Sequence, residues 1–320
     1  PGTVGLWVPA PWPFAALVVL VSRAGEGGTA GPGGALGSQR IGIAEFSEEL
    51  FADPAFHRFE RLGVGHVRRV VPVDVVEAGG QDLARLDRWM AGARQRGLEA
   101  MASFGVQRTD RHLPSDAEYR RNITAFMDRY SWVHTFSPWN EPNHRAQPTH
   151  TDPATAARFY RIVRSECERR YDDCRVVALE PDDQSDMAAY VRGFLAELAP
   201  ERPKLWGFHD YVDVNRRVSE PDQALKKLLA LVEGEVWLSE TGGWVKLGRR
   251  LPYDENRSAD ALRRLFAVAE RHRDRVRRVY VYEWFQSPGN PWDSALVAAD
   301  RRTRPGYDIV EAAIRRRTGD

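Results

Sequence analysis

Residues 66–107 read HVRRVVPVDVVEAGGQDLARLDRWMAGARQRGLEAMASFGVQ and contain, in turn, a strand, a helix and the next strand. The two ends, 66–74 and 99–107, suit short buried strands, whereas 79–98 has apolar residues at helical spacing. The same unit repeats from residue 39 onward. Further strands are predicted over 41–46, 132–141, 175–181, 205–214, 235–240 and 278–285. The remaining helical patterns lie near 54–63, 116–130, 153–171, 186–199, 219–233, 256–275 and 306–317.

Strict alternation of strands and helices predicts a parallel sheet whose strands are connected by helices. Eight such units in roughly 280 residues fit a closed barrel better than an open doubly wound sheet. No Gly-x-Gly-x-x-Gly turn follows the first strand, which argues against dinucleotide binding. The predicted fold class is therefore α/β, with a single (β/α)8 TIM barrel over residues 39–320 and no second domain.

The first 38 residues do not fit this barrel pattern. Residues 6–22 form the one long apolar run, and its uninterrupted core, 14–21, is too short to span a bilayer comfortably. A Gly/Ala-rich stretch over 23–38 reads as a flexible linker. Together they resemble a secretory apolar segment with its tether, although the chain starts without Met or a basic region. We expect a secreted or extracytoplasmic protein, with this segment as a potential tether; the alternative is a leader without a role.

Composition excludes several classes of protein. The 46 basic and 45 acidic residues leave a net charge of +1, which gives no electrostatic footprint for nucleic acid. The apolar content of 42% argues against disorder, and two cysteines are too few for a disulfide scaffold. We expect no nucleic-acid partner and no stable membrane insertion of the barrel.

The two cysteines, Cys167 and Cys174, are seven residues apart in SECERRYDDC. In one continuous helix they would lie about two turns apart, too far for a disulfide. A bridge therefore requires the helix to stop between them, which Asp172 and Asp173 permit, and export would favour it. A buried free thiol at Cys167, which continues an apolar helical series, is the alternative.

Polar and aromatic residues gather where the predicted strands end. In a (β/α)8 barrel the chemistry takes place at these carboxyl ends of the strands. The residues in question are Asp74, Gln107, Asn140, Glu141, Glu180, His209, Tyr211, Glu240 and Trp284. This edge of the barrel is therefore the expected site.

Two of these ends carry recognisable motifs. Strand four ends in Pro138-Trp139-Asn140-Glu141-Pro142-Asn143, and strand seven ends in Leu238-Ser239-Glu240-Thr241-Gly242-Gly243. With a His-x-Tyr after strand six and a tryptophan on strand eight, the sequence resembles the clan A glycoside hydrolases, which include families 5 and 39, over about residues 40–318. The resemblance implies a retaining enzyme in which Glu141 is the general acid/base and Glu240 the nucleophile.

The chemistry of glycosidic bonds leads to the same pair independently. Hydrolysis needs one protonated carboxyl and one ionised carboxylate that flank the anomeric carbon. Strands four and seven lie on opposite sides of an eight-stranded ring, so Glu141 and Glu240 should face each other across its mouth. A separation of about 5–5.5 Å between the carboxyl groups favours double displacement with retention.

Other strand-end residues suit the binding of a sugar. The Asn140 amide can bind the sugar 2-hydroxyl, and the resemblance gives it that role. His209 and Tyr211 are two apart on one strand face, where Tyr211 can donate to Glu240 and His209 can orient Glu141 or bind a hydroxyl. Core packing or a structural turn is the alternative for each.

Two more assignments depend on the alternation of side chains between the two faces of a strand, which we call strand parity. Alternation on strand two points Arg68 into the barrel and Arg69 outward, and the resemblance places such an arginine near the nucleophile. Trp284 shares a face with Tyr280 and Tyr282, and its indole could stack on a pyranose at the mouth, with packing in the core as the alternative. Trp139, Trp244 and Trp292 are further candidate sugar platforms, and the candidate hydroxyl binders are Asp74, Glu180 and Asp182.

These features favour a retaining β-glycoside hydrolase that acts on a poly- or oligosaccharide by double displacement. It would need no cofactor and no metal, because the sequence shows no histidine–cysteine cluster at ligand spacing. The alternative is a non-catalytic glycan-binding barrel of the same ancestry; a metal- or phosphate-dependent barrel enzyme would show ligand clusters or a phosphate-binding glycine loop. Sugar configuration, linkage, exo or endo action and oligomeric state are not predicted.

Overall fold

A computed structural model describes residues 39–51, 56–106, 112–216, 220–286 and 290–318. The eight strands of its main sheet, all parallel, run in the order β5-β4-β3-β2-β1-β9-β7-β6. Their bounds are β1 Arg40–Ala44, β2 His66–Pro72, β3 Glu99–Gly105, β4 Thr135–Ser137, β5 Arg175–Val176, β6 Leu205–His209, β7 Glu235–Thr241 and β9 Val276–Val281. Each corresponds to one predicted strand.

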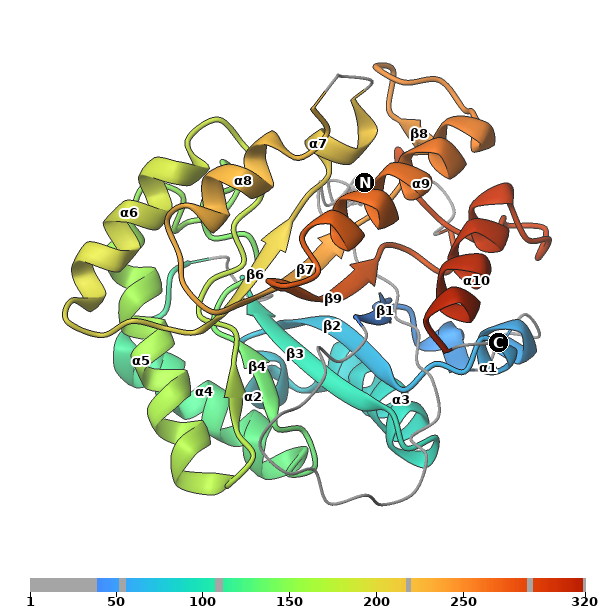
Figure 1. Cartoon of the computed structure of the whole chain (residues 1–320). Helices are drawn as coiled ribbons and strands as arrows, with labels where there is room; N and C mark the ends of the chain where they lie inside the picture. Colours follow the sequence, from blue (N-terminus) through green and yellow to red (C-terminus); the bar gives the residue numbers. More distant parts are fainter. Residues whose placement is uncertain (1–38, 52–55, 107–111, 217–219, 287–289, 319–320) are drawn as a thin grey trace, which may run out of the picture.

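Backbone hydrogen bonds close this sheet into a barrel. The chain after β5 pairs with β6, because the amides of Ala178, Gly207 and His209 donate to Leu205, Leu179 and Pro181, respectively. On the opposite side, β1 lies between β2 and β9. Figure 1 shows the strands at the centre of the molecule with helices around them. The (β/α)8 fold predicted from the sequence is confirmed.

The helices of the described residues alternate with the strands as expected. They are η1 Glu48–Phe51, α1 Phe56–Arg61, α2 Val75–Ala78, α3 Gly80–Gln95, α4 Asp116–Arg129, α5 Pro153–Arg170, α6 Met187–Leu198, α7 Val212–Asn215, α8 Gln223–Leu229, α9 Glu255–Arg271 and α10 Pro305–Thr318. Ser115 and Glu118 form a capping box on α4, and Asp152 caps α5 through the Thr155 amide.

Most predicted strands extend too far at their carboxyl ends, and two of these errors concern the site. The strand expected over 205–214 ends at His209, and Val212–Asn215 instead forms α7. The Asp183 carboxylate accepts hydrogen bonds from the amides of Val212 and Asp213, which supports a helical turn there. β4 covers only Thr135–Ser137 of the predicted 132–141, so Asn140 and Glu141 lie on the loop that follows it.

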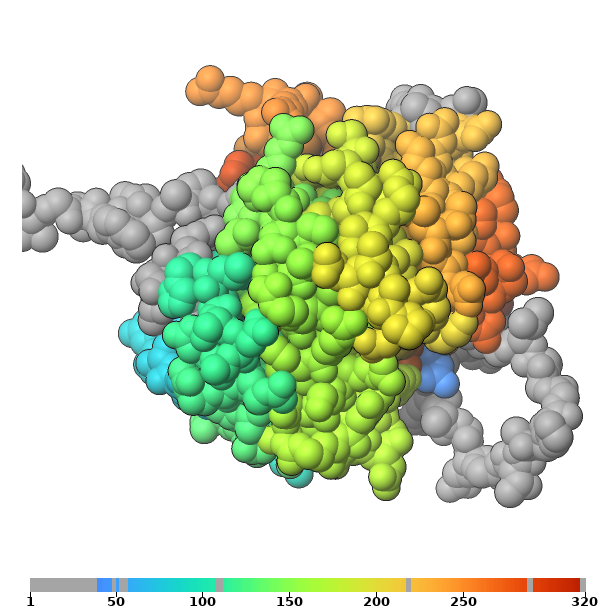
Figure 2. Space-filling view, turned by 90° about the vertical axis from the view of Figure 1, so that its left-hand side faces the viewer, coloured from blue at the N-terminus to red at the C-terminus, as the bar shows by residue number. Residues whose placement is uncertain are grey.

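Aromatic side chains fill the layer between the barrel and the helices. Phe104 of β3 contacts Phe126 of α4 with ring centroids 5.3 Å apart and stacks on Phe136 of β4 at 6.2 Å. Figure 2 shows the outer layer on one side of the barrel, where α4, α5 and α6 lie next to one another. Burial of these apolar faces fixes the strands whose ends carry the site.

Two expectations concern the N-terminus and the membrane. The apolar segment and linker over residues 1–38 lie outside the described residues. Among the helices that the structure describes, none has both the length and the apolar character to cross a bilayer.

Cys167 and Cys174 form a disulfide, with their Cα atoms 5.7 Å apart. Helix α5 ends at Arg170, and Tyr171 has extended backbone angles, φ −136° and ψ 126°. The chain therefore turns back toward the end of the helix, which is the condition that the spacing imposed. Of the two alternatives for the cysteines, the structure shows the bridge.

We expect the double variant Cys167→Ser/Cys174→Ser to lose about 2 kcal/mol of unfolding free energy, because the bridge closes only a short loop in the unfolded chain. Urea unfolding followed by circular dichroism measures this loss. Dithiothreitol should lower the stability of the wild type to that of the variant and leave the variant unchanged. Equal wild-type stability with and without dithiothreitol, after confirmed reduction, would contradict the prediction.

Candidate active site

Six of the seven predicted site residues meet at the carboxyl ends of the strands, and Trp284 does not. Arg68 comes from β2, Asn140 and Glu141 from the loop after β4, His209 from the end of β6, Tyr211 from just after it, and Glu240 from β7. All six side chains are buried. Each is held by a hydrogen bond or ion pair to another member of the group.

The two glutamates face each other at short range. Glu141, His209 and Glu240 each have a polar side-chain atom within 4.8 Å of those of the other two. One carboxylate oxygen of Glu141 therefore lies within 4.8 Å of one of Glu240. Glu141 has a φ of 46°, in the left-handed region, which is uncommon for a residue with a side chain. A conformation of this kind costs of order 1 kcal/mol and persists only where the surroundings hold it.

The Arg68 guanidinium lies at the centre of the site. Its Nη1 donates to Oε2 of Glu240 at 2.8 Å, and its Nη2 donates to Oδ1 of Asn140 at 2.6 Å. Nε and Nη2 bind the two carboxylate oxygens of Glu180, each at 3.0 Å. The neighbouring Arg69 points outward instead, with its guanidinium 5.4 Å from the ring centroid of Trp89 on α3.

His209 connects the two sides of the site. Its Nδ1 lies 3.0 Å from Oε1 of Glu141, and its Nε2 lies 3.3 Å from Nη2 of Arg68 and 3.6 Å from Oε1 of Glu180. Burial alone would lower the pKa of His209, but the carboxylates of Glu240, Glu141 and Glu180 raise it to about 9. The imidazole is therefore protonated at neutral pH.

Burial raises the pKa of both glutamates and His209 lowers it, but the balance differs between the two. Burial raises the pKa of Glu141, but the hydrogen bond and charge of His209 outweigh it and lower that pKa below the usual value. The pKa of Glu240 rises to about 7 through burial, although His209 and Arg68 oppose the rise. The lowered pKa of Glu141 and the raised pKa of Glu240 run opposite to the order expected of an acid at residue 141 and a nucleophile at residue 240, and the role of each glutamate stays a prediction.

Tyr211 holds the second oxygen of Glu240. Its hydroxyl donates to Oε1 at 3.0 Å, while Arg68 binds Oε2. Both oxygens of this carboxylate are thus fixed, and the group has one orientation toward Glu141.

Trp284 is not at the mouth of the barrel, and its predicted position was wrong. Its side chain is 0% exposed and meets Phe59 of α1 at 5.3 Å and Tyr307 of α10 at 5.9 Å, between the barrel and the helices. Strand β9 ends at Val281, so the alternation of sides does not extend to residue 284. Tyr282 faces the site instead, with its ring 6.3 Å from that of Tyr211.

An aromatic wall, made of Tyr211, Trp244, Tyr282 and Trp292, stands beside Glu240. Trp292 contacts Tyr211 at 5.1 Å, Trp244 at 5.4 Å and Tyr282 at 6.3 Å. Two loop strands, β8 Lys246–Leu247 and β10 Trp292–Asp293, pair antiparallel and hold the two tryptophans in place. Trp244 and Trp292 are partly exposed. The sequence singled out both tryptophans but gave no sign that their loops would pair.

The candidate hydroxyl binders have other contacts. Glu180 is buried, and both of its carboxylate oxygens are bound by Arg68, an interaction that a sugar hydroxyl would have to compete with. Asp182 accepts from Nδ2 of Asn143 at 2.6 Å, and burial and Glu141 raise its pKa to about 7. Asp74 is buried at the start of α2.

A metal ion is the other ligand that such donors suit. In the described ranges, Glu141, His209 and Glu240 are the one group of three acidic, histidine or cysteine side chains close enough to share an ion. Nη1 of Arg68 lies 2.8 Å from Oε2 of Glu240. The pKa of His209 is raised to about 9, so its ring carries a positive charge at neutral pH. Both positive charges disfavour a cation there, so the donors fit a sugar better than a metal.

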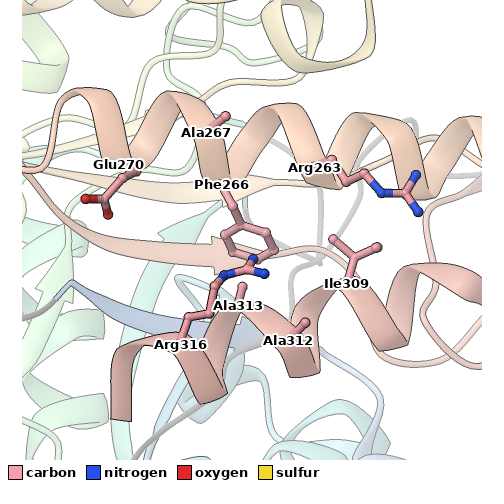
Figure 3. Close-up of a pocket in the computed structure, with 8 residues that line it drawn as sticks. All are labelled: Arg263, Phe266, Ala267, Glu270, Ile309, Ala312, Ala313 and Arg316. Atoms are coloured by element: carbon pink, nitrogen blue, oxygen red, sulfur yellow. The ribbon is translucent and has the colours of Figure 1, made fainter. Parts of the chain in front are cut away.

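The structure also has a hollow of about 550 Å³ on the outside of the barrel (Figure 3). It lies between α9 and α10, with Phe266 and Ile309 in its lining and Arg263 and Arg316 at its sides. None of the strand-end residues lines it. The hollow is therefore separate from the candidate site.

The sequence matches no family model and no curated protein. Solved structures of similar fold include xylanase 10B from Thermotoga maritima (12% identity, 89% of this chain and 97% of that chain, TM-score 0.63) and an endo-1,4-β-xylanase from Penicillium canescens (10%, 83% and 90%, 0.61). A family 53 glycoside hydrolase catalytic domain from Ignisphaera aggregans aligns at 17% identity over 81% and 87%, with a TM-score of 0.60. At these identities the likeness establishes the shared barrel fold.

We expect the ring of His209 to titrate near pH 9, because three carboxylates surround it. Histidine NMR measures the midpoint, with the signal assigned by its loss in His209→Asn. In Glu141→Gln the midpoint should fall, since the carboxylate 3.0 Å from Nδ1 is gone. A wild-type midpoint at or below the ordinary histidine value of about 6.5 would contradict this charge assignment.

Proposed function

We propose that the chain is a retaining β-glycoside hydrolase that cleaves a poly- or oligosaccharide by double displacement. The observation that carries the proposal is the pair Glu141 and Glu240, with carboxylate oxygens within 4.8 Å of each other at the mouth of the barrel. This gap suits direct attack by a carboxylate, whereas inversion needs about 6.5–9.5 Å between the carboxyl groups to admit a water.

Glu240 is the nucleophile in this proposal. Arg68 and Tyr211 bind one oxygen each, so the carboxylate enters the reaction already oriented toward the anomeric carbon. Attack forms the glycosyl ester and breaks the bond to the leaving oxygen. Because the pKa of Glu240 is about 7, the rate should rise as pH increases through neutrality.

Glu141 and His209 together supply the proton. His209 carries it in the resting site and faces Oε1 of Glu141 at 3.0 Å, which is within hydrogen-bond range. Movement of the proton to Glu141 makes that group the acid that protonates the leaving oxygen. In the second half of the reaction Glu141 takes a proton from water as the water attacks the ester, and the proton returns toward His209.

Asn140 and the aromatic wall suit a sugar in this position. The Oδ1 atom of Asn140 accepts from Arg68, which assigns its amide group as the donor to the sugar 2-hydroxyl. That contact strengthens as the oxocarbenium-like transition state develops. The partly exposed rings of Trp244 and Trp292 offer apolar surface to the faces of neighbouring sugar rings.

The second candidate function is glycan binding without cleavage. Binding alone does not require two carboxylates forced together in a buried site, since like charges at that range repel. Cleavage does require them, which is why we favour hydrolysis. Export of the protein remains a prediction, and the Cys167–Cys174 bridge supports it because disulfides persist in oxidising compartments.

We expect Glu240→Ala to reduce kcat on aryl β-glycosides by at least about 10³-fold, because it removes the nucleophile. Azide should restore turnover of the variant and give a glycosyl azide of inverted configuration, whereas the wild type gains nothing from azide. The screen uses aryl β-glycosides and β-linked polysaccharides. Full activity in the variant would overturn the assignment.

We expect Glu141→Gln to slow cleavage most for substrates with poor leaving groups, because these depend on protonation of the departing oxygen. The measurement is kcat/KM across a series of aryl β-glycosides of graded leaving-group pKa. A steeper dependence in the variant than in the wild type supports a proton donor at residue 141. An equal reduction across the series would argue against it.

A further inference from the structure

We propose that Glu180 is a positioning residue that fixes the Arg68 guanidinium and thereby sets the orientation of Asn140 and both the orientation and the charge of Glu240. The inference rests on the proposed function and adds a third carboxylate to the two that the reaction uses. Glu180 makes no substrate contact in this proposal, because Arg68 binds both of its carboxylate oxygens.

The geometry of the Arg68 hydrogen bonds carries the proposal. Glu180 binds Nε and Nη2 in a bidentate pair, with both distances 3.0 Å. Such a pair holds the plane of the guanidinium, which leaves Nη1 directed at Glu240 and Nη2 also in reach of Asn140. Without Glu180 the guanidinium keeps its charge but loses the contact that fixes its plane.

The barrel makes room for Glu180 in a specific way. Residue 180 follows β5 and pairs with Asn140 through an isolated parallel bridge. On the other side is Gly207 of β6, where an added Cβ would lie 2.6 Å from Cγ of Glu180 and 2.6 Å from Oγ of Ser239. The glycine therefore provides the space that this carboxylate occupies.

The charges around Glu180 decide what it does. Arg68 of β2 and His209 of β6 are the positive groups that face it, and Glu141 and Glu240 are the other carboxylates of the site. Burial opposes ionisation, but Arg68 and His209 hold the pKa of Glu180 well below its usual range. Glu180 therefore stays ionised throughout the reaction and does not exchange the catalytic proton.

A permanently ionised Glu180 offsets part of the Arg68 charge. If that negative charge is removed, Arg68 acts more strongly on Glu240 and lowers the pKa of the nucleophile. His209 also loses a carboxylate 3.6 Å from its Nε2, so its proton is held less firmly. Both changes move the active pH range in the same direction, toward lower pH.

The test compares Glu180→Gln, which removes the charge, with Glu180→Asp, which keeps it on a shorter side chain. In Glu180→Gln we expect kcat to fall about 10²-fold with KM within about twofold of wild type, because the fault is in orientation and charge and not in contact with the substrate. The acidic and basic limbs of the kcat/KM pH profile should both shift to lower pH by about one unit. In Glu180→Asp we expect a lower kcat, with both limbs at the same pH as in the wild type.

The matched control is Glu166→Gln on α5. Glu166 is also a buried carboxylate bound by arginines, Arg120, Arg169 and Arg170, but it lies on an outer helix. We expect Glu166→Gln to lower thermal stability and to leave kcat and both pH limbs unchanged. A purely structural Glu180 would behave in the same way, so unmoved limbs in Glu180→Gln would overturn the proposal. A raised KM at unchanged kcat would also overturn it.

One readout does not depend on glycosidase activity. In Glu180→Gln the His209 titration midpoint, followed by NMR, should fall by about one pH unit. If the midpoint falls in a correctly folded Glu180→Gln variant but the wild-type protein has no glycosidase activity, the proposed function is refuted and the charge effect of Glu180 remains. If the wild-type protein is an active glycosidase but the His209 midpoint in Glu180→Gln does not change, only the Glu180 proposal is refuted. If Glu180→Gln does not fold, an unchanged kcat in Glu180→Asp is the contradicting result.

Discussion

The structure of the site depends on one buried cation inside the barrel, the guanidinium of Arg68. A guanidinium that is 0% exposed is costly unless carboxylates and other acceptors surround it. Glu180, Glu240 and Asn140 supply those acceptors from three different segments of the chain. Removal of any one partner leaves buried donors unsatisfied, so the cost of burying Arg68 holds these segments in one arrangement. That constraint fixes Glu240 directly and Glu141 through its chain neighbour Asn140, while His209 binds Glu141 itself.

The barrel provides the places from which these side chains converge. All eight strands of its sheet are parallel, so their carboxyl ends share one edge, and residues distant in sequence meet there. Two of the key residues lie just beyond the regular strands. Glu141 follows β4 with a φ of 46°, and Tyr211 follows β6 at the start of α7. The strands therefore fix the positions of the site residues, and short irregular segments after the strands orient the side chains that would react.

Much of this arrangement could be predicted from the sequence, because it depends on local patterns. Alternating strand and helix periods predicted the barrel, and strand parity pointed Arg68 inward. The same parity failed for Trp284, because β9 ends at Val281 and the chain no longer alternates. The aromatic wall and the contact between Glu180 and Arg68 could not be predicted, since both depend on the relative positions of segments far apart in the chain.

The charge state of the site is the feature that sequence motifs describe least well. The sequence motif assigns Glu141 as the acid. Which of two neighbouring groups holds the proton, however, depends on the charges around each of them. Here that group is His209, which has three carboxylates around it and a pKa of about 9. Nδ1 of His209 and Oε1 of Glu141 are 3.0 Å apart, so in the reaction we propose the two groups act as one proton donor. In that proposal the proton moves to Glu141 as Glu240 gives up its negative charge to the new bond with the sugar. The acid would then form during the reaction, and Glu141 need not be protonated beforehand.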